Sequence, residues 1–209
     1  GMALAEKSSS NSDKKRFTYI LAGDGDLQEP IALGASTLAG HWKLSNLIMF
    51  YDKNDIQIAG KTSRVDSTNY AKLFEAMDWH VQEIDGHDHQ EIREALNNAQ
   101  LNEKPSIIIG QTTIAKGSHS LENNPKAHGA PFSDDEIFKT KDKLGLPQES
   151  FYCSEEIINH FQRNFKSLKE NVIETNKSFK TELSDYNQML KSLKVPDFGN
   201  DLMATRQAF

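Results

Sequence analysis

The segment GDGD at positions 23–26 places acidic residues beside glycines, directly after the apolar run 17–22. One interpretation is a plain turn. The other is a ligand site, because the ligands of an open parallel sheet bind beyond the carboxyl ends of its strands, where Asp24 would lie. The amide of Gly25, at the start of a helix, can donate to a phosphate group. In the second interpretation, backbone approaches a charged group closely while a carboxylate holds a cation.

Negative charge gathers at this strand end. Asp24, Asp26 and Glu29 crowd the start of the following helix, so a bare phosphate group bound there would be repelled. A divalent cation removes this conflict, because Mg²⁺ and Ca²⁺ take oxygen ligands from carboxylates and diphosphate groups together. The ligand-site interpretation therefore predicts a cation between the protein and the phosphate.

The next strand end supplies further oxygen atoms. Asn54 follows Asp24 by thirty positions and comes just after the apolar run 47–52. If the two strands are neighbours, Asp24 offers a carboxylate oxygen, Asn54 an amide oxygen and Ile56 its backbone carbonyl. Together these groups make half of an octahedral coordination shell, the geometry that Mg²⁺ prefers.

Four apolar runs alternate with helical patterns, which predicts a doubly wound α/β fold: a mostly parallel sheet with helices on both faces. Near-continuous apolarity in the first, second and fourth runs indicates strands buried on both sides. Small residues in the first helical pattern indicate close approach to another backbone. The predicted strands are 17–22, 47–52, 80–85 and 106–114, and the predicted helices are 30–42, 68–79 and 87–101.

The sequence changes character after residue 150. Apolar residues recur at helical spacing over 151–194, with one interruption at Asn176, which predicts a helical region made of one long helix or a hairpin of two. This region is either an appendage packed on its own domain or a coiled-coil partner site. We expect a linker and the start of another helix in 195–209, and an exposed loop in 8–15. Because both ends lie in helix-forming patterns, we expect a fragment of a longer protein.

The composition excludes several classes of partner. A formal net charge of -6 argues against nucleic acid and against anionic membranes, which usually require a basic face. Cys153 is the single cysteine, so the chain can build neither a disulfide framework nor a thiolate metal cluster, and a reducing, cytoplasmic setting fits. We find no apolar stretch of about 18 residues for a membrane span.

Four stretches of this sequence resemble one enzyme family. They are GDGDLQEP (23–30), ASTLAGHWKLSNLIMFYDKNDIQIAG (35–60), FEAMDWHVQEIDGHD (74–88) and GSHSLENNPKAHGAPF (117–132). Together they resemble the thiamine-diphosphate-binding domain of transketolase. The resemblance runs from the first residue to about residue 146, weakens through the helical region and returns in the last residues. FYDKNDIQIAG and HGAP are its most specific parts.

The resemblance implies a role for each matched residue. Asp24, the side chain of Asn54 and the carbonyl of Ile56 would coordinate Mg²⁺ or Ca²⁺. The Gly25 amide would bind the diphosphate of the cofactor, with Asn54 contacting it as well. Ile58, with Ile56 as a second candidate, would pack on the thiazolium ring, whereas the pattern alone also fits an ordinary strand-end core.

Two further residues gain a role only from the resemblance. His128, in HGAP, would contact the diphosphate and the sugar substrate and could move a proton; otherwise it would be a solvated loop histidine, our interpretation of His87, His89 and His119. Glu29 would lie at a dimer interface that assembles the paired active sites. Without the resemblance, Glu29 is a solvated first-turn glutamate.

The implied activity is transfer of a two-carbon ketol unit from a ketose phosphate to an aldose phosphate, by a cytoplasmic homodimer that uses thiamine diphosphate. Residues 1–150 would be a diphosphate-binding domain without its N-terminal part, and 195–209 would lead into an absent pyrimidine-binding domain. That domain carries the glutamate that activates the cofactor, so we expect this chain alone to be inactive. The alternatives are a related thiamine-diphosphate enzyme, such as dihydroxyacetone synthase, and a non-catalytic scaffold fragment.

Overall fold

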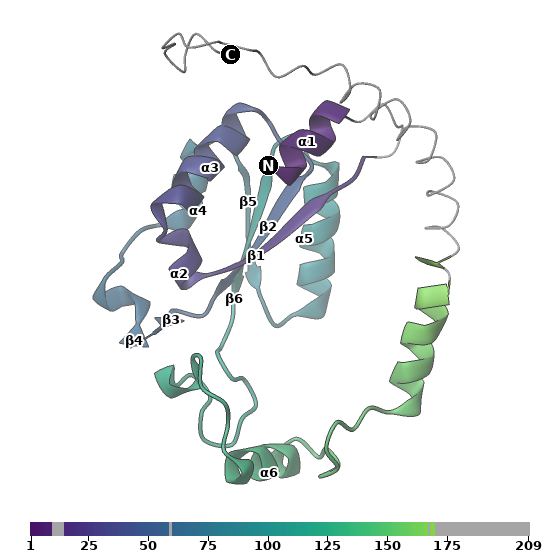
Figure 1. Cartoon of the computed structure of the whole chain (residues 1–209). Coiled ribbons are helices and arrows are strands. Elements are labelled where there is room, and N and C mark those ends of the chain that lie inside the picture. Colours follow the sequence, from purple (N-terminus) through teal and green to yellow (C-terminus); the bar gives the residue numbers. More distant parts are fainter. Residues whose placement is uncertain (10–14, 59, 167, 170–209) are drawn as a thin grey trace, which may run out of the picture. The chain divides into compact units, whose positions relative to one another are not determined.

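The computed structural model describes residues 1–9, 15–58, 60–166 and 168–169 of the 209-residue chain (Figure 1). The chain divides into two units, Gly1–Gln148 and Glu149–Phe209. The predictions for positions beyond 169, including the break at Asn176 and the linker, lie outside the described residues.

A four-stranded parallel sheet with the order β1-β2-β6-β5 forms the centre of the first unit. Each of its strands matches one predicted apolar run, so the predicted parallel α/β sheet is confirmed. The last strand is shorter than predicted, because its pairing ends at Gln111. The strands are β1 Thr18–Gly23, β2 Leu47–Lys53, β5 His80–Asp85 and β6 Ser106–Gln111, with a separate antiparallel pair, β3 Ile56–Gln57 and β4 Gly60–Lys61.

Helices connect the strands. The three predicted helices are confirmed as α3, α4 and α5, and Pro30 occupies the first turn of α3. Ser8 and Ser9 belong to α1, so the predicted loop 8–15 is wrong at its start. Helix α6 is not among the predicted helices. The helices are α1 Met2–Ser9, α2 Asp24–Leu27, α3 Pro30–His41, α4 Tyr70–Ala76, α5 His89–Leu101 and α6 Asp134–Lys143, with 3₁₀ turns η1 Thr62–Arg64 and η2 Pro125–Ala127.

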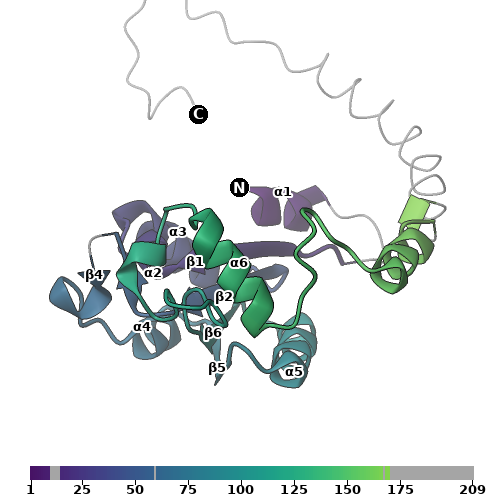
Figure 2. The same ribbon diagram turned by 90° about the horizontal axis from the view of Figure 1, so that it is seen from below.

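The two faces of the sheet are covered unequally. Figure 2 shows α3 and α4 on one side of the strands and α5 on the other. The cluster under α3 and α4 is the larger and includes Tyr51, Phe74 and Trp79, whereas the cluster under α5 is built around Ile48 and Ile108. Helices therefore pack on both faces, as predicted.

The prediction that β1 is buried on both sides is wrong. β1 is an edge strand of this sheet, and its side chains toward α5 are uncovered: Leu21 is 85% exposed and Tyr19 52% exposed. Helix α5 packs on β2, β5 and β6 and does not reach β1 to the same extent. Apolar composition alone cannot distinguish an edge strand from a central one.

The small residues of α3 allow the predicted close approach. A Cβ atom at Gly40 would collide with the carbonyl oxygen of Met77, which follows α4. The indole N–H of Trp79 donates to the backbone carbonyl of Ser36 at 2.9 Å. These contacts fix α3 against the turn that leads into β5.

In the second unit, residues 155–166 form a helix, which confirms the start of the predicted helical region. Its apolar side chains Ile158, Phe161 and Phe165 are exposed. Whether this region is an appendage or a partner site stays a prediction. Within the described part of the chain, no helix combines the length and apolarity that crossing a membrane requires.

Candidate functional site

Asp24 lies where β1 passes into a short helix. Gly23 ends β1 in an extended conformation, and α2 begins at Asp24 with Gly25 in its first turn. Parallel pairing places Ala22 beside Tyr51 of β2. Only 3% of Asp24 is exposed. The carboxylate is therefore enclosed at the carboxyl edge of the sheet, which a plain solvated turn would not require.

The neighbouring strand donates hydrogen bonds to this carboxylate. The Tyr51 hydroxyl donates to Asp24 Oδ1 at 2.8 Å, and the backbone N–H of Asn54 donates to Oδ2 at 3.2 Å. The two strand ends therefore converge, as the cation-site hypothesis requires. An ionised carboxylate has about four lone-pair sites, so further acceptor capacity remains.

Asn54 is held in a turn of its own. Its side-chain oxygen accepts the backbone N–H of Ile56 at 3.0 Å, and its amide nitrogen donates to Asp52 Oδ1 at 3.4 Å. The Oδ1 atom has a second lone pair that this bond does not use. The turn thus ties Ile56 to Asn54, whose backbone contacts Asp24.

The electrostatics of Asp24 favour a cation. Burial raises the pKa of this carboxyl, and the nearby Asp55 carboxylate raises it further, whereas the hydrogen bonds from Tyr51 and Asn54 lower it. Burial and the hydrogen bond to Asp24 also raise the pKa of Tyr51, so its hydroxyl remains a donor. The hydrogen bonds thus offset the cost of burying the Asp24 carboxylate only in part. A cation beside it would stabilise the ionised form of this carboxylate.

A pocket of about 400 Å³ opens over Asp24, a volume within the range of small-molecule sites. Its walls come from β2, β4, η1 and the start of α4, and they combine carboxylates, hydroxyls and amines. The lining residues are Asp24, Tyr51, Lys53, Asp55, Lys61, Thr62, Ser63, Asp66, Thr68 and Tyr70.

The donor set fits a cation that arrives with a phosphate ligand. No group of three or more His, Cys, Asp or Glu side chains in the described residues is placed to hold a metal ion. A cation at Asp24 would therefore depend on neutral oxygens, such as the Asn54 amide and the Ile56 carbonyl, and on oxygens of its ligand. Mg²⁺ is commonly bound in this way, through one or two carboxylates plus substrate phosphates.

The other residues of α2 lie around the same strand end. A Cβ atom at Gly25 would meet nothing within 4 Å, so its backbone borders open space. Asp26 turns back and accepts the backbone N–H of Gly23 at 2.8 Å. Glu29 is exposed and precedes α3 without a side-chain capping bond. Gly25 is thus accessible to a ligand, and Asp26 is used within the turn.

The two candidate isoleucines have different surroundings. Ile56 is 3% exposed and belongs to the protein core, whereas Ile58, in the turn after β3, is 78% exposed. The side chain of Ile58 is therefore available to a ligand. The Ile56 side chain is packed, which leaves its backbone carbonyl as the group that a ligand could use.

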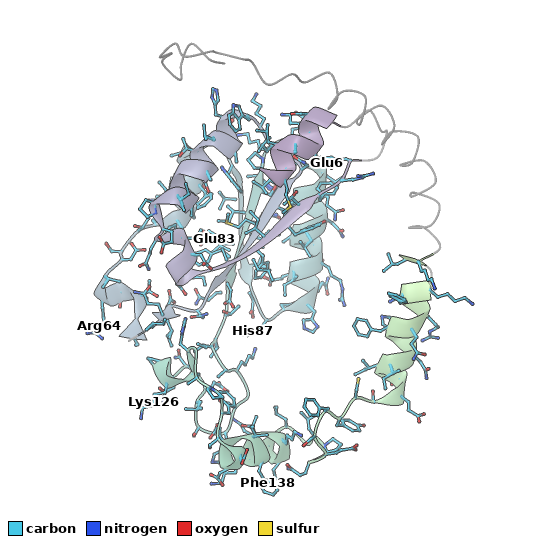
Figure 3. The ribbon with its side chains drawn as sticks, in the orientation of Figure 1. Glu6, Arg64, Glu83, His87, Lys126 and Phe138 are labelled. Carbon is cyan, nitrogen blue, oxygen red and sulfur yellow. The ribbon has the colours of Figure 1, made fainter. Side chains whose placement is uncertain are left out.

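His128 lies in the long connection after β6, on the side of the sheet where the strands end. It is exposed, and its backbone N–H closes the 3₁₀ turn η2 by donating to Pro125 at 3.1 Å. Gly129 follows with φ +71°, a conformation that favours glycine. Figure 3 shows Lys126 of η2 at the same end of the sheet as Arg64 of η1. Among the described residues, no hydrogen bond or ion pair joins the side chains of His128 and Asp24.

Helix α6 ties down this connection through a buried glutamate. The Glu136 carboxylate accepts the backbone N–H of Ser120 at 2.8 Å and its hydroxyl at 2.6 Å, and these bonds lower the pKa of Glu136. Lys143 donates to the Ser118 carbonyl at 2.8 Å. Ser133 caps α6 by accepting the Glu136 backbone N–H at 3.2 Å. The Ser-x-x-Glu spacing was the available sequence signal for this helix start.

His87 corrects one interpretation from the sequence. It is not simply a solvated loop histidine, because its Nε2 atom accepts the backbone N–H of Thr113 at 2.8 Å. This bond joins the residues that follow β5 to those that follow β6. His87 therefore helps to position the start of the connection that carries His128.

A larger groove, of about 510 Å³, lies on the opposite side of the sheet and contains none of the predicted site residues. Its lining is mainly apolar and includes Leu21 of β1, Phe50 of β2 and Leu96 of α5. The chemistry-bearing groups are thus in the smaller pocket, and size does not identify the site.

Comparison with known families gives a consistent match. The family described as "Transketolase, thiamine diphosphate binding domain" matches residues 1–199. Transketolase from Sinorhizobium medicae is 42% identical over 161 residues, which cover 75% of this chain and 23% of that protein. Transketolase from Aquifex aeolicus is 34% identical over 230 residues, which cover 100% of this chain and 33% of that protein.

Solved structures agree. The crystal structure of Campylobacter jejuni transketolase superimposes with a TM-score of 0.84 and 38% identity, covering 98% of this chain and 34% of that one. A Pichia stipitis transketolase variant in complex with fructose 6-phosphate gives a TM-score of 0.78 and 30% identity, covering 90% and 29%. The chain thus spans about a third, or less, of the length of these relatives. It belongs to the transketolase family, within the thiamine-diphosphate-binding domain.

Proposed function

We propose that this chain forms the cation- and diphosphate-binding part of an active transketolase. The observation that supports this most directly is the convergence of Asp24 and Asn54, which brings a buried carboxylate and an amide side chain to one edge of a parallel sheet. The relatives described above are all named transketolase, which favours that activity over dihydroxyacetone synthase and over a non-catalytic scaffold.

The described residues divide the binding of the cofactor between them. Asp24, the Asn54 side chain and the Ile56 carbonyl would hold Mg²⁺ or Ca²⁺, and the Gly25 amide would bind the diphosphate together with Asn54. Ile58, exposed in the turn after β3, would pack on the thiazolium ring. Thiamine diphosphate, when bound, supplies the stabilised carbanion on which two-carbon transfer depends.

His128 would bind the diphosphate and the sugar phosphate and would move a proton at the substrate hydroxyl. It is exposed, and the turn formed by η2 and Gly129 fixes its backbone. A neutral imidazole carries one donor and one acceptor nitrogen, which suits this exchange. Structures of Pichia stipitis transketolase are described in complex with fructose 6-phosphate and sedoheptulose 7-phosphate, so sugar phosphates are the proposed substrates here.

The assembled enzyme would be a cytoplasmic homodimer with Glu29 at the subunit interface. Glu29 is exposed, and its side chain forms no capping bond. Its carboxylate is therefore accessible to a second subunit. A pyrimidine-binding domain would complete the active site. Because this chain covers about a third of its relatives, we expect no turnover from the isolated polypeptide.

Calorimetry with thiamine diphosphate and Mg²⁺ tests this proposal. In the full-length protein that contains this segment, we expect Asp24→Asn to weaken cation-dependent binding of thiamine diphosphate by at least about tenfold. Loss of a residue that only hydrogen-bonds a metal ligand already weakens metal binding about 10- to 100-fold. Asp135→Asn is the control, because it neutralises an exposed carboxylate paired with Lys139, away from Asp24, and should leave affinity unchanged. Equal Mg²⁺ dependence in wild type and Asp24→Asn would refute the assignment of the cation site.

A further inference from the structure

Tyr51 is a buried phenol directed at the proposed cation site. It is 1% exposed, and its hydroxyl donates to Asp24 Oδ1 at 2.8 Å. It is none of the groups proposed above to bind the cation or the cofactor. Its ring lies on the face of the sheet that packs against α3 and α4, within the larger hydrophobic cluster.

Contacts from α4 fix the position of the Tyr51 ring. Tyr70, at the start of α4, packs edge-on against it with ring centroids 5.6 Å apart and planes at 74°. The Tyr70 hydroxyl donates to Asp66 Oδ2 at 2.7 Å, and Asp66 in turn accepts the backbone N–H of Thr68 at 2.9 Å. Each ring is therefore held at its hydroxyl and by its contact with the other ring.

The two hydrogen bonds on Asp24 determine how its carboxylate is rotated. Tyr51 holds Oδ1 from the body of β2, and the Asn54 backbone holds Oδ2 from the end of that strand. With both oxygens engaged, the plane of the carboxylate is fixed before a cation binds. Partners of this kind orient metal ligands, and their loss typically weakens metal binding about 10- to 100-fold.

We propose that Tyr51 is a positioning residue: its hydroxyl holds the Asp24 carboxylate in the orientation that a divalent cation requires. This inference rests on the proposed function, because it presupposes a cation at Asp24. The competing explanation is structural. In that case the ring fills the core, and the hydroxyl merely satisfies a buried carboxylate.

Tyr51→Phe separates the two explanations, since it keeps the ring and removes the hydroxyl. Tyr19→Phe is the matched control, because it removes a tyrosine hydroxyl of β1 that bonds Gln100 of α5, in the groove that contains none of the predicted site residues. The experiment is titration of Mg²⁺, and separately of Ca²⁺, into the full-length protein with saturating thiamine diphosphate, followed by calorimetry. Circular dichroism checks that each variant is folded.

We expect Tyr51→Phe to weaken Mg²⁺ binding about 10- to 100-fold and to weaken Ca²⁺ binding less. Mg²⁺ demands near-ideal octahedral geometry, whereas Ca²⁺ tolerates varied ligand directions, so a misdirected carboxylate should cost Mg²⁺ more. Tyr19→Phe should change neither affinity by more than about twofold. A purely structural hydroxyl would lower thermal stability without changing the ratio of the Mg²⁺ and Ca²⁺ affinities.

The outcomes separate this inference from the proposed function. If wild type binds neither cation with thiamine diphosphate, the proposed function fails. If wild type binds both and Tyr51→Phe binds them equally well, the positioning role is overturned while the cation site stands. If Tyr51→Phe does not fold, Tyr51→His takes its place, because its shorter aromatic donor is displaced from Asp24. An unchanged Mg²⁺ to Ca²⁺ preference in that variant overturns the inference.

Discussion

Asp24 and Glu136 are the buried carboxylates in the described part of the chain, and the fold treats them differently. Asp24 sits at the ends of β1 and β2, whereas Glu136 lies in the first turn of α6. The pKa of Asp24 is raised, mainly by burial, and that of Glu136 is lowered by the hydrogen bonds it accepts from Ser120. Figures 1 and 2 show α6 beyond the carboxyl ends of the strands, so both carboxylates lie toward the same end of the sheet.

The two carboxylates differ in role: Glu136 stabilises the structure, whereas Asp24 belongs to the proposed cation site. Glu136 receives the donors that its charge requires from the protein itself, and in return it holds the connection that carries His128. Asp24 receives donors from Tyr51 and Asn54 that do not offset its burial. A buried carboxylate left in this condition is suited to an external cation.

Removal of the Glu136 carboxylate should produce the largest loss of stability. Glu136→Ala leaves two donors of Ser120 without their acceptor, so we expect a melting temperature lower by several degrees and faster hydrogen exchange between residues 117 and 122. Differential scanning calorimetry and exchange mass spectrometry measure both. Asp135→Ala is the control, because it removes only an exposed pair with Lys139, worth about 0.5 kcal/mol or less. Equal effects of the two variants would contradict the anchoring role.

A smaller effect is expected from the cap of α6. Ser133→Ala removes the acceptor for the Glu136 backbone N–H and should lower the free energy of unfolding by about 1 kcal/mol. Ser133→Asp restores an acceptor and adds a negative charge at the helix start, so it should recover the loss. Urea denaturation measures these differences. A failure of Ser133→Asp to recover stability would show that the serine acts by packing instead.

The smallest effects are the opposite pH dependences of the two carboxylates. Because the folded pKa of Glu136 is lowered, its stabilisation is present above its unfolded pKa of about 4.3 and is lost as pH falls through the folded value. Because the folded pKa of Asp24 is raised, its contribution is present below about 3.9 and is lost as pH rises through the folded value.

Urea denaturation between pH 3 and 7 in a chelator-containing buffer tests this contrast. The stability of wild type relative to Glu136→Gln should increase with pH, and its stability relative to Asp24→Asn should decrease with pH. Slopes of the same sign would contradict the distinction between a compensated and an uncompensated carboxylate.

The hydrophobic pattern of the sequence predicts most of this fold. The features that it does not predict depend on which strands pair. Apolar runs locate the four parallel strands, but the position of β1 at the sheet edge depends on which strands pair, so the exposure of Leu21 could not be predicted. The glycines and Asp24 indicate the strand-end site. The bond between Tyr51 and Asp24 depends on the register of β1 and β2, which the residue types do not encode individually.

The sequence indicates less about the long connection after β6, for a different reason. Its conformation rests on side-chain contacts with distant residues, such as His87 to Thr113 and Glu136 to Ser120. Neither contact produces a periodic pattern. Only the match of HGAP to the family brought His128 forward as a candidate, and its role stays a prediction.

The strand order has a consequence for how readily each strand opens. β2 is hydrogen-bonded on both sides, to β1 and to β6, whereas β1 has one bonded neighbour among the described strands. Within the described strands we therefore expect slower amide exchange in β2 than in β1, a difference that hydrogen-exchange mass spectrometry would measure.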